Sequence, residues 1–172
     1  MSVDPTRIEL KTNVKKEKDP TLVRMSGTAV HGNTPFDVPF ISQIDGNLWQ
    51  GGCQTGLILP HFFKSIISLY PWEAYRVTHE LENAAYFKMF DSIDQDTDIV
   101  SSIAQLVYSL KQRGPVLIHC QAGLNRSGLV AGKVLMMEGY SADEAIKVLR
   151  EKRSPAVLCN PAFEEYLRSS ES

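Results

Sequence analysis

The 172-residue sequence has few cysteines and no long apolar run, and each shortage disfavours a class of protein. Its three cysteines, Cys53, Cys120 and Cys159, form no Cys-x-x-Cys pair, which argues against a disulfide scaffold and fits a reducing compartment. No stretch approaches the ~20 apolar residues that span a bilayer, and the first residues contain no apolar segment typical of a signal peptide. We therefore expect a cytoplasmic protein without a membrane anchor.

The sequence also lacks a strong excess of charge, since 18 basic and 20 acidic residues leave a formal charge of -2. Proteins that bind the nucleic-acid backbone normally carry a positive excess, so this composition disfavours that class. His31, His61 and His79 have no metal-ligand spacing with one another or with a cysteine. We expect neither a metal nor any other cofactor.

The length of the chain suits one domain with a substantial core. Residues 1–40 carry several lysines, prolines and glycines with little periodicity. We expect these residues to form a poorly ordered N-terminal extension that becomes an ordered edge near its end. The predicted domain is residues 41–172, in which short apolar runs alternate with amphipathic segments.

Apolar runs bounded by turn residues predict short strands. They lie at residues 46–52, 63–70, 84–90 and 115–120. Residues 98–113 place apolar side chains on one face of a predicted helix, and Asp98 is positioned to cap it. Residues 73–83 predict a single helical turn.

Three more helices are predicted after the last strand. Residues 127–138 are apolar on nearly all sides, as expected of a buried helix. The next helix begins at Ser141, with Glu144 in capping-box spacing, and the last begins at Asn160, which a proline follows. This order predicts a single compact α/β domain in which helices flank a mostly parallel central sheet and ligands bind at the carboxyl ends of the strands.

The stretch HCQAGLNRSG, residues 119–128, joins an apolar strand to a helix. Cys120 ends the strand and Ser127 starts the helix, so the backbone N–H groups around Gly123 converge on one point at a helix N-terminus. Arg126 adds a planar guanidinium that can bind two oxygens of a phosphate at once. The remaining residues of this predicted phosphate cradle are Gln121, Ala122, Leu124 and Asn125.

Cys120 lies where it can act as a nucleophile. A helix N-terminus and a nearby cation both favour the thiolate over the thiol. A thiolate beneath a bound phosphate is aimed at phosphorus, and a hydrogen bond from Ser127 can steady it as a leaving group. His119 either packs behind the loop or orients it, and Asn125 either shapes the loop or is a simple turn residue.

The pattern His-Cys-x-Ala-Gly-x-x-Arg-Ser-Gly resembles the phosphate-binding loop of the cysteine-dependent protein tyrosine phosphatase superfamily, in its dual-specificity branch. GNLWQGG, FKSIISLYP and EKRSPAVLCNPAFEEYL are similar to other segments of that branch, so the resemblance covers roughly residues 41–168. It implies a dual-specificity phosphatase-like α/β domain that hydrolyses phosphate monoesters through a phosphocysteine and needs no metal. It also favours the orienting role for His119.

The resemblance further implies a catalytic aspartate on a loop before Cys120. Four aspartates precede it at positions 91, 94, 96 and 98. We expect Asp91 to be the general acid, because the apolar alternation of residues 87–90 would place it at the carboxyl end of a strand, on the same sheet edge as Cys120. Asp94 is the alternative.

The remaining singled-out side chains have simpler interpretations. Cys53 and Cys159 are expected to be structural, with a resolving-thiol role as the less favoured interpretation. Tyr70 and Trp72 follow a predicted strand and either line the rim of the site or pack in the core.

The predicted function is a phosphoprotein phosphatase that accepts phosphotyrosine and phosphoserine or phosphothreonine, because no long insertion builds a deep cleft. One alternative is an RNA 5′-triphosphatase, whose loops GLNRSG also resembles, or another non-protein phosphatase of the superfamily. The other is a pseudophosphatase module that binds phosphate without chemistry. We expect a monomer acting on a phosphorylated protein, with an RNA 5′ end disfavoured by the net charge and no membrane partner.

Overall fold

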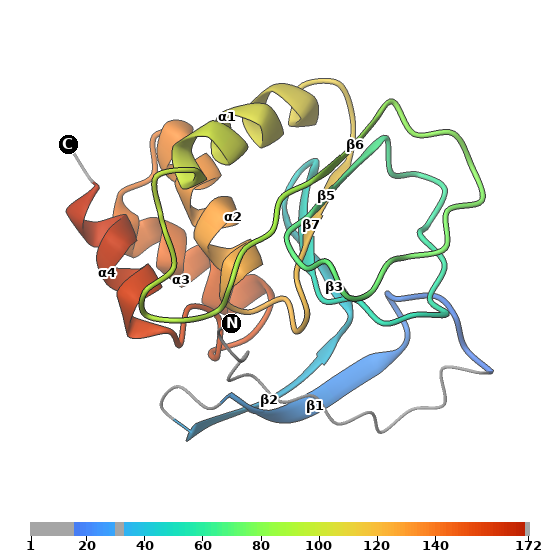
Figure 1. Cartoon of the computed structure of the whole chain (residues 1–172), viewed down its shortest axis with the longest axis horizontal. Helices are drawn as coiled ribbons and strands as arrows, with labels where there is room; N and C mark the ends of the chain where they lie inside the picture. Colours follow the sequence, from blue (N-terminus) through green and yellow to red (C-terminus); the bar gives the residue numbers. More distant parts are fainter. Residues whose placement is uncertain (1–15, 30–32, 171–172) are drawn as a thin grey trace.

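A five-stranded sheet carries the HCQAGLNRSG stretch at its centre (Figure 1). The computed structural model describes residues 16–29 and 33–170. Four strands are parallel and β3 is an antiparallel edge strand, which confirms the predicted mostly parallel sheet. In sheet order the strands are β3 (Ile41–Asp45), β4 (Leu48–Gly51), β7 (Val116–His119), β5 (Ser65–Ser68) and β6 (Asn83–Tyr86).

The carboxyl ends of the three central strands lie at one level of the sheet. His119, the last residue of β7, pairs in register with Gly51 of β4 on one side and with Ser68 of β5 on the other. All four residues of β7 are buried, as expected of a strand that is covered on both faces. The residues that follow these three ends therefore meet at one edge of the sheet.

Four helices gather on one side of the sheet, with α2 in their midst (Figure 1). Gly132 of α2 lets Leu167 of α4 approach closely, since a β-carbon there would lie 2.7 Å from the Leu167 side chain. The four predicted helices are confirmed. They are α1 (Val100–Lys111), α2 (Arg126–Met137), α3 (Ala142–Lys152) and α4 (Pro161–Ser169). None of the helices within the described residues is long and apolar enough to cross a bilayer.

Two of the predicted helix caps are confirmed. Ser141 Oγ accepts a hydrogen bond from Glu144 N at 3.1 Å, and the Glu144 carboxylate accepts one from Ser141 N at 3.0 Å, which completes a capping box. Asn160 Oδ1 accepts a hydrogen bond from Ala162 N at 3.0 Å at the start of α4.

The predicted Asp98 cap is wrong. Helix α1 begins after Ile99 and has no side-chain cap. Asp98 instead lies in a turn, where its backbone N–H donates to Asp96 Oδ1 at 2.9 Å. Asp98 thus lies one residue before the N-cap position, which Ile99 occupies.

Two other predicted elements differ from the structure. Residues 73–83 form no helical turn, because this segment is extended and Arg76 exchanges backbone hydrogen bonds with Leu57 and Leu59. The strand predicted over residues 84–90 ends at Tyr86, which pairs with Ser68, the last residue of β5. Phe87 N still donates to Ser68 O at 2.8 Å, and the pairing stops there because β5 ends at Ser68.

A β-hairpin lies in the region where the sequence predicts a poorly ordered extension. Strands β1 (Arg24–Ala29) and β2 (Thr34–Pro39) pair antiparallel and lie below the main sheet in Figure 1. Phe36, Val38 and Phe40 are buried at alternate positions, so one face of the hairpin packs against the domain. Residues 1–15 of the predicted extension lie outside the described residues, and the domain boundary at residue 40 stays a prediction.

Replacing Ser141 and Asp98 separately compares a cap that forms with a predicted cap that does not. We expect Ser141→Ala to lower the free energy of unfolding by about 1 kcal/mol, because α3 loses its capping box. Asp98→Ala should stay within about 0.5 kcal/mol of the parent protein. Urea unfolding followed by circular dichroism measures both, and an Asp98 effect as large as that of Ser141 would contradict the turn assignment.

Candidate active site

The loop from Cys120 to Arg126, here called the Cys120–Arg126 loop, joins the end of β7 to the start of α2. The Cys120 side chain is buried, and the residue's backbone N–H donates to Gly51 O at 3.1 Å. Asn125 occupies the N-cap position of α2, but its side chain makes no capping hydrogen bond. The first turn of α2 therefore offers uncapped N–H groups and the positive end of its dipole above the Cys120 thiol.

Two buried side chains beneath the loop hold its carbonyl groups. Arg153 donates to Ala122 O at 3.1 Å and to Gly123 O at 2.7 Å. Gln50, in β4, donates a second hydrogen bond to Gly123 O at 3.0 Å. Since the carbonyl and the N–H of one peptide plane point in opposite directions, these contacts turn the following N–H groups to the other side of the loop.

Backbone donors complete the same arrangement at both ends of the loop. Gln121 O accepts from Cys53 N at 3.0 Å, and Leu124 O accepts from Leu158 N at 3.1 Å. Among the residues that the structure describes, none accepts a hydrogen bond from the backbone N–H groups of residues 121–125. The loop thus has its acceptors occupied and its donors available, which is the arrangement that binds an oxyanion.

Gly123 is required by both conformation and space. Its φ of +70° lies in the left-handed region, and a β-carbon there would lie 2.5 Å from Gly52 N. Gly52 in turn passes close beneath the loop, because its own β-carbon would lie 2.5 Å from Gln121 O. The end of β4 and the Cys120–Arg126 loop therefore pack closely against each other through Gly51, Gly52 and Gly123.

Ser127 connects the thiol to the support beneath the loop. Its Oγ lies 3.3 Å from Cys120 Sγ and accepts a hydrogen bond from Gln50 Nε2 at 3.1 Å. Because Gln50 supplies a hydrogen to this oxygen, the Ser127 hydroxyl hydrogen can point to the sulfur of Cys120. This geometry suits stabilisation of a thiolate.

Arg126 is 2% exposed, and two neighbours fix its guanidinium at the edge of the loop. One amino group donates to Met89 O at 3.2 Å, and the ring of Tyr70 lies 5.1 Å from the guanidinium carbon, within cation–π distance. Tyr70 therefore lies at the site, as one of its two interpretations predicted.

Asp91 is buried beside the loop, where two asparagines hold its carboxylate. Asn125 Nδ2 donates to Asp91 Oδ2 at 2.9 Å and Asn160 Nδ2 donates to Oδ1 at 3.0 Å. Both amide orientations are determined, since Asn125 Oδ1 accepts from Asn160 N and Asn160 Oδ1 accepts from Ala162 N. Asn125 thus ties the Cys120–Arg126 loop to the segment after β6 and to α4, which is more than a turn residue does.

His119 lies behind the loop. Its Nδ1 is 3.3 Å from Cys120 O, and its ring meets the Tyr75 ring edge-on at 5.4 Å between centres. Burial lowers the pKa of His119 to about 4, the hydrogen bond to Cys120 O acts in the opposite direction, and the charge of Arg126 lowers it further. The ring is therefore neutral at pH 7, so it supports the loop by packing and hydrogen bonding rather than by charge.

Arg153 and Asn160 also contribute to the site, although the sequence predicted no role at the site for either residue. Arg153 also donates to Pro39 O, Phe40 O and Ser42 Oγ, so one guanidinium joins the end of the hairpin to the loop. Burial lowers the pKa of Arg153 to about 10, which leaves it a cation at neutral pH. Both residues lie in the segment EKRSPAVLCNPAFEEYL, whose similarity to the phosphatase family was the one sequence feature that could have pointed to them.

Of the other two cysteines, Cys53 is buried and Cys159 is half-buried. Burial raises the pKa of Cys53, and the charges of Glu73 and Cys120 act in the same direction. Burial also raises the pKa of Cys159, against a hydrogen bond with Asn125. Within the described residues, no group of three or more His, Cys, Asp or Glu side chains is placed to hold a metal ion.

Comparison with known proteins identifies the family of this site. A family profile described as the dual specificity phosphatase catalytic domain matches residues 66–172, which is more than half of the chain. The chain belongs to the dual specificity phosphatase family. Eight of the solved structures that it resembles are 14–19% identical in sequence and show a shared fold.

Several of these structures are of human proteins. The tyrosine phosphatase-like serine/threonine/tyrosine-interacting protein has a TM-score of 0.63 at 19% identity, with 75% of this chain and 93% of that chain covered. DUSP28 has a TM-score of 0.63 at 18% identity, with 77% and 93% covered. A mouse putative dual specificity phosphatase, complexed with zinc tungstate, has a TM-score of 0.61 at 19% identity, with 77% and 88% covered.

Curated relatives are similar over about half of the chain. Mouse dual specificity protein phosphatase 19 is 30% identical over 112 residues, which are 55% of this chain and 50% of that protein. Zebrafish protein tyrosine phosphatase domain-containing protein 1 is 31% identical over 103 residues, which are 54% of this chain and 14% of that protein. The match thus spans half or less of the length of these relatives.

The low pKa of His119 predicts a pH-dependent contribution to stability. Between about pH 6.5 and pH 4 the unfolded chain binds a proton that the folded His119 does not, so stability falls as the pH falls through this window. The full effect is about 3 kcal/mol. The stability gap between the parent protein and His119→Gln should therefore shrink from pH 7 to pH 4.5 in urea titrations, with His61→Gln as the exposed control. A gap that stays constant would contradict the buried, neutral ring.

Proposed function

We propose that the protein is a cysteine-dependent phosphatase that hydrolyses phosphotyrosine and phosphoserine or phosphothreonine monoesters in proteins through a phosphocysteine on Cys120. The observation that carries this proposal is the Cys120–Arg126 loop beside a buried thiol. Arg153 and Gln50 bind the loop carbonyls on one side, so the loop N–H groups point to the other side. These N–H groups and Arg126 bind the phosphate oxygens.

In the first step the Cys120 thiolate attacks phosphorus and the bond from phosphorus to the ester oxygen breaks. Arg126 and the loop N–H groups bind the three equatorial oxygens, over which the transition state spreads its charge. The departing oxygen takes a proton from Asp91, which acts as general acid. The alcohol or phenol leaves, and phosphate stays on sulfur.

In the second step water attacks the phosphocysteine. Asp91, now a carboxylate, takes a proton from this water as the oxygen bonds to phosphorus, and the sulfur–phosphorus bond breaks. The hydroxyl of Ser127, 3.3 Å from Cys120 Sγ, donates a hydrogen bond to the thiolate that leaves. Inorganic phosphate is released and the enzyme returns to its starting state.

Asn125 and Asn160 position Asp91 for both steps. Asn125 Nδ2 and Asn160 Nδ2 each donate to a different oxygen of Asp91, so the carboxylate is held in one orientation beside the loop. Asp94, the alternative acid, is exposed. The buried position of Asp91, tied to Asn125 of the loop, supports Asp91 as the residue that faces the leaving group.

The alternatives have less support. A pseudophosphatase would use Arg126 to bind phosphate, but it would not need the contact between Ser127 Oγ and Cys120 Sγ, which serves the leaving thiolate. An RNA 5′-triphosphatase would profit from a positive surface, whereas the chain carries a net charge of -2. We further propose that the protein acts as a cytoplasmic monomer, where a reducing environment keeps its three free cysteines reduced.

Substitutions at the nucleophile and at the arginine separate binding from chemistry. We expect Cys120→Ser to abolish hydrolysis while tungstate binding measured by calorimetry is largely kept, because the cradle consists of backbone and Arg126. Arg126→Lys should bind tungstate about 10- to 100-fold more weakly and lose turnover, because an ammonium cannot bond two oxygens in one plane. Turnover by Cys120→Ser, assayed in EDTA, would remove the nucleophile assignment.

The general acid is tested by the leaving group. An alkoxide needs a proton as its bond to phosphorus breaks, whereas an activated aryl leaving group hardly does. Asp91→Asn should therefore slow a phosphoserine peptide by about 10² to 10⁴ and an activated aryl phosphate much less. Asp94→Asn is the matched control and should resemble the parent enzyme. The reverse pattern would move the assignment to Asp94.

A further inference from the structure

Three aromatic side chains form a continuous row beside Arg126. The ring of Tyr70 lies against the guanidinium, the ring of Trp72 is 5.0 Å from that of Tyr70, and the ring of Phe90 is 6.2 Å from that of Trp72. Both ring pairs are tilted, at 54° and 56°. We call Tyr70, Trp72 and Phe90 the aromatic rim.

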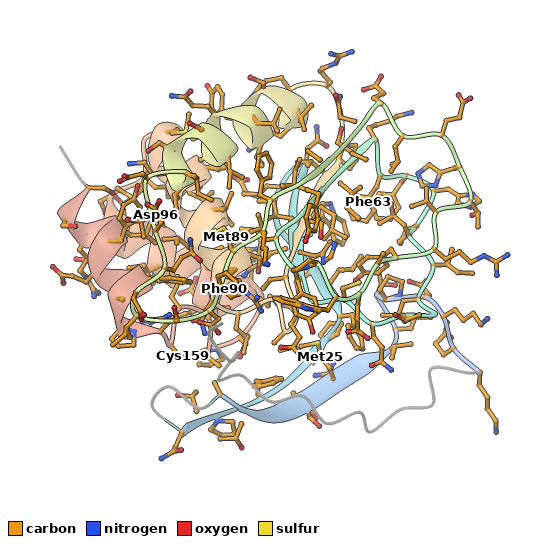
Figure 2. All side chains as sticks on the ribbon, in the orientation of Figure 1. Met25, Phe63, Met89, Phe90, Asp96 and Cys159 are labelled. Carbon is orange, nitrogen blue, oxygen red and sulfur yellow. The ribbon has the colours of Figure 1, made fainter. Side chains whose placement is uncertain are left out.

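The aromatic rim is built from two chain segments that meet at Arg126. Tyr70 and Trp72 follow β5, which ends beside His119, and Phe90 lies beyond β6 in the segment that holds Asp91. Arg126 bonds the backbone of Met89, the residue before Phe90, and Figure 2 shows Met89 and Phe90 together on this segment. The rim is therefore attached to the phosphate-binding machinery from both sides.

The exposure of these side chains falls steeply from the rim to the reacting atoms. Trp72 is 48% exposed, whereas Cys120 and Arg126 are each 2% exposed. The row of rings thus runs from the buried guanidinium of Arg126 out to a half-exposed indole. Large exposed aromatics offer contact area at little cost in side-chain entropy, which makes them effective binding groups at the mouth of a site.

We propose that Trp72, supported by Phe90, stacks on the aryl ring of a phosphotyrosine whose phosphate occupies the Cys120–Arg126 loop. This inference rests on the proposed function and adds that the enzyme prefers aryl to alkyl phosphate monoesters. Phosphotyrosine carries its phosphorus one ring further from the peptide backbone than phosphoserine or phosphothreonine does. Its ring thus spans the depth between the buried sulfur and the exposed indole, where a short alkyl side chain leaves the rim without a partner.

Phosphotyrosine fits the rim better than a nucleic-acid end does. Its ring is bonded directly to the phosphate oxygen and so leaves the loop at the level of Tyr70 and Trp72. A nucleobase is separated from its 5′ phosphates by a ribose and would lie further out. The net charge of -2 also provides no general attraction for RNA.

The test compares one peptide sequence phosphorylated on tyrosine or on threonine. Trp72→Ala should lower kcat/KM for the phosphotyrosine peptide about tenfold, because the variant loses one aromatic stacking contact. The phosphothreonine peptide should be almost unaffected, and Trp72→Phe should restore most of the loss. Equal losses on both peptides, or no loss, would overturn the proposal.

Phe62→Ala is the matched control, because it removes another exposed aromatic ring at the opposite, amino end of β5. It should leave both peptides unchanged. Turnover of triphosphate-ended RNA that depends on Trp72, without a phosphotyrosine effect, would also overturn the proposal.

A binding measurement separates failure of the rim from failure of the chemistry. In the Cys120→Ser background, calorimetry compares the amides of phosphotyrosine and phosphothreonine. Trp72→Ala should weaken binding of the first about tenfold and leave the second and tungstate unchanged. If the parent enzyme hydrolyses neither peptide but this binding pattern is observed, the proposed hydrolysis is contradicted and the proposed role of Trp72 in binding phosphotyrosine is supported. Equal binding of both amides with and without Trp72 would overturn the rim.

Discussion

The hydrogen bonds from Arg153 and Gln50 to the carbonyls of Ala122 and Gly123 are the constraint on which the site depends. Without donors beneath the loop, these carbonyls would be free to face the phosphate, and their partial negative charge would repel it. The donors must be buried and fixed, which requires a cation under the loop and a strand that runs close below it. The close approach of β4, made possible by Gly52 and Gly123, is a consequence of that requirement.

The same constraint links parts of the chain that are distant in sequence. Arg153 reaches the last residues of the hairpin and the loop with one guanidinium, so the N-terminal hairpin supports the site although it lies outside the sheet. Asn125 and Asn160 connect the loop, α4 and Asp91 in a second network. A buried polar network of this kind holds one arrangement when each of its hydrogen bonds is made, and it loses several together when a member is removed.

Local patterns in the sequence were sufficient wherever the structure depends on neighbouring residues. The Ser141 capping box, the Asn160 cap and the turn from β7 into α2 involve residues within a few positions of one another, and each was predicted. Arg153 was missed, because its contacts with Gly123 and Pro39 join residues that are 30 and 114 positions apart in the sequence. The end of β6 was misplaced because it depends on where its partner β5 ends. The Asp98 cap failed because α1 begins one residue later than predicted, with Ile99 at the N-cap position.

Chemical trapping tests the central claim, that phosphate is transferred to Cys120 within this loop. A phosphopeptide with a labelled phosphate is mixed with excess enzyme and quenched within a single turnover, and the protein is digested and mapped by mass spectrometry. The account predicts that label appears on the peptide containing Cys120 and decays as inorganic phosphate forms. Hydrolysis that proceeds at the same rate with no label on Cys120, or with label on another residue, would contradict it.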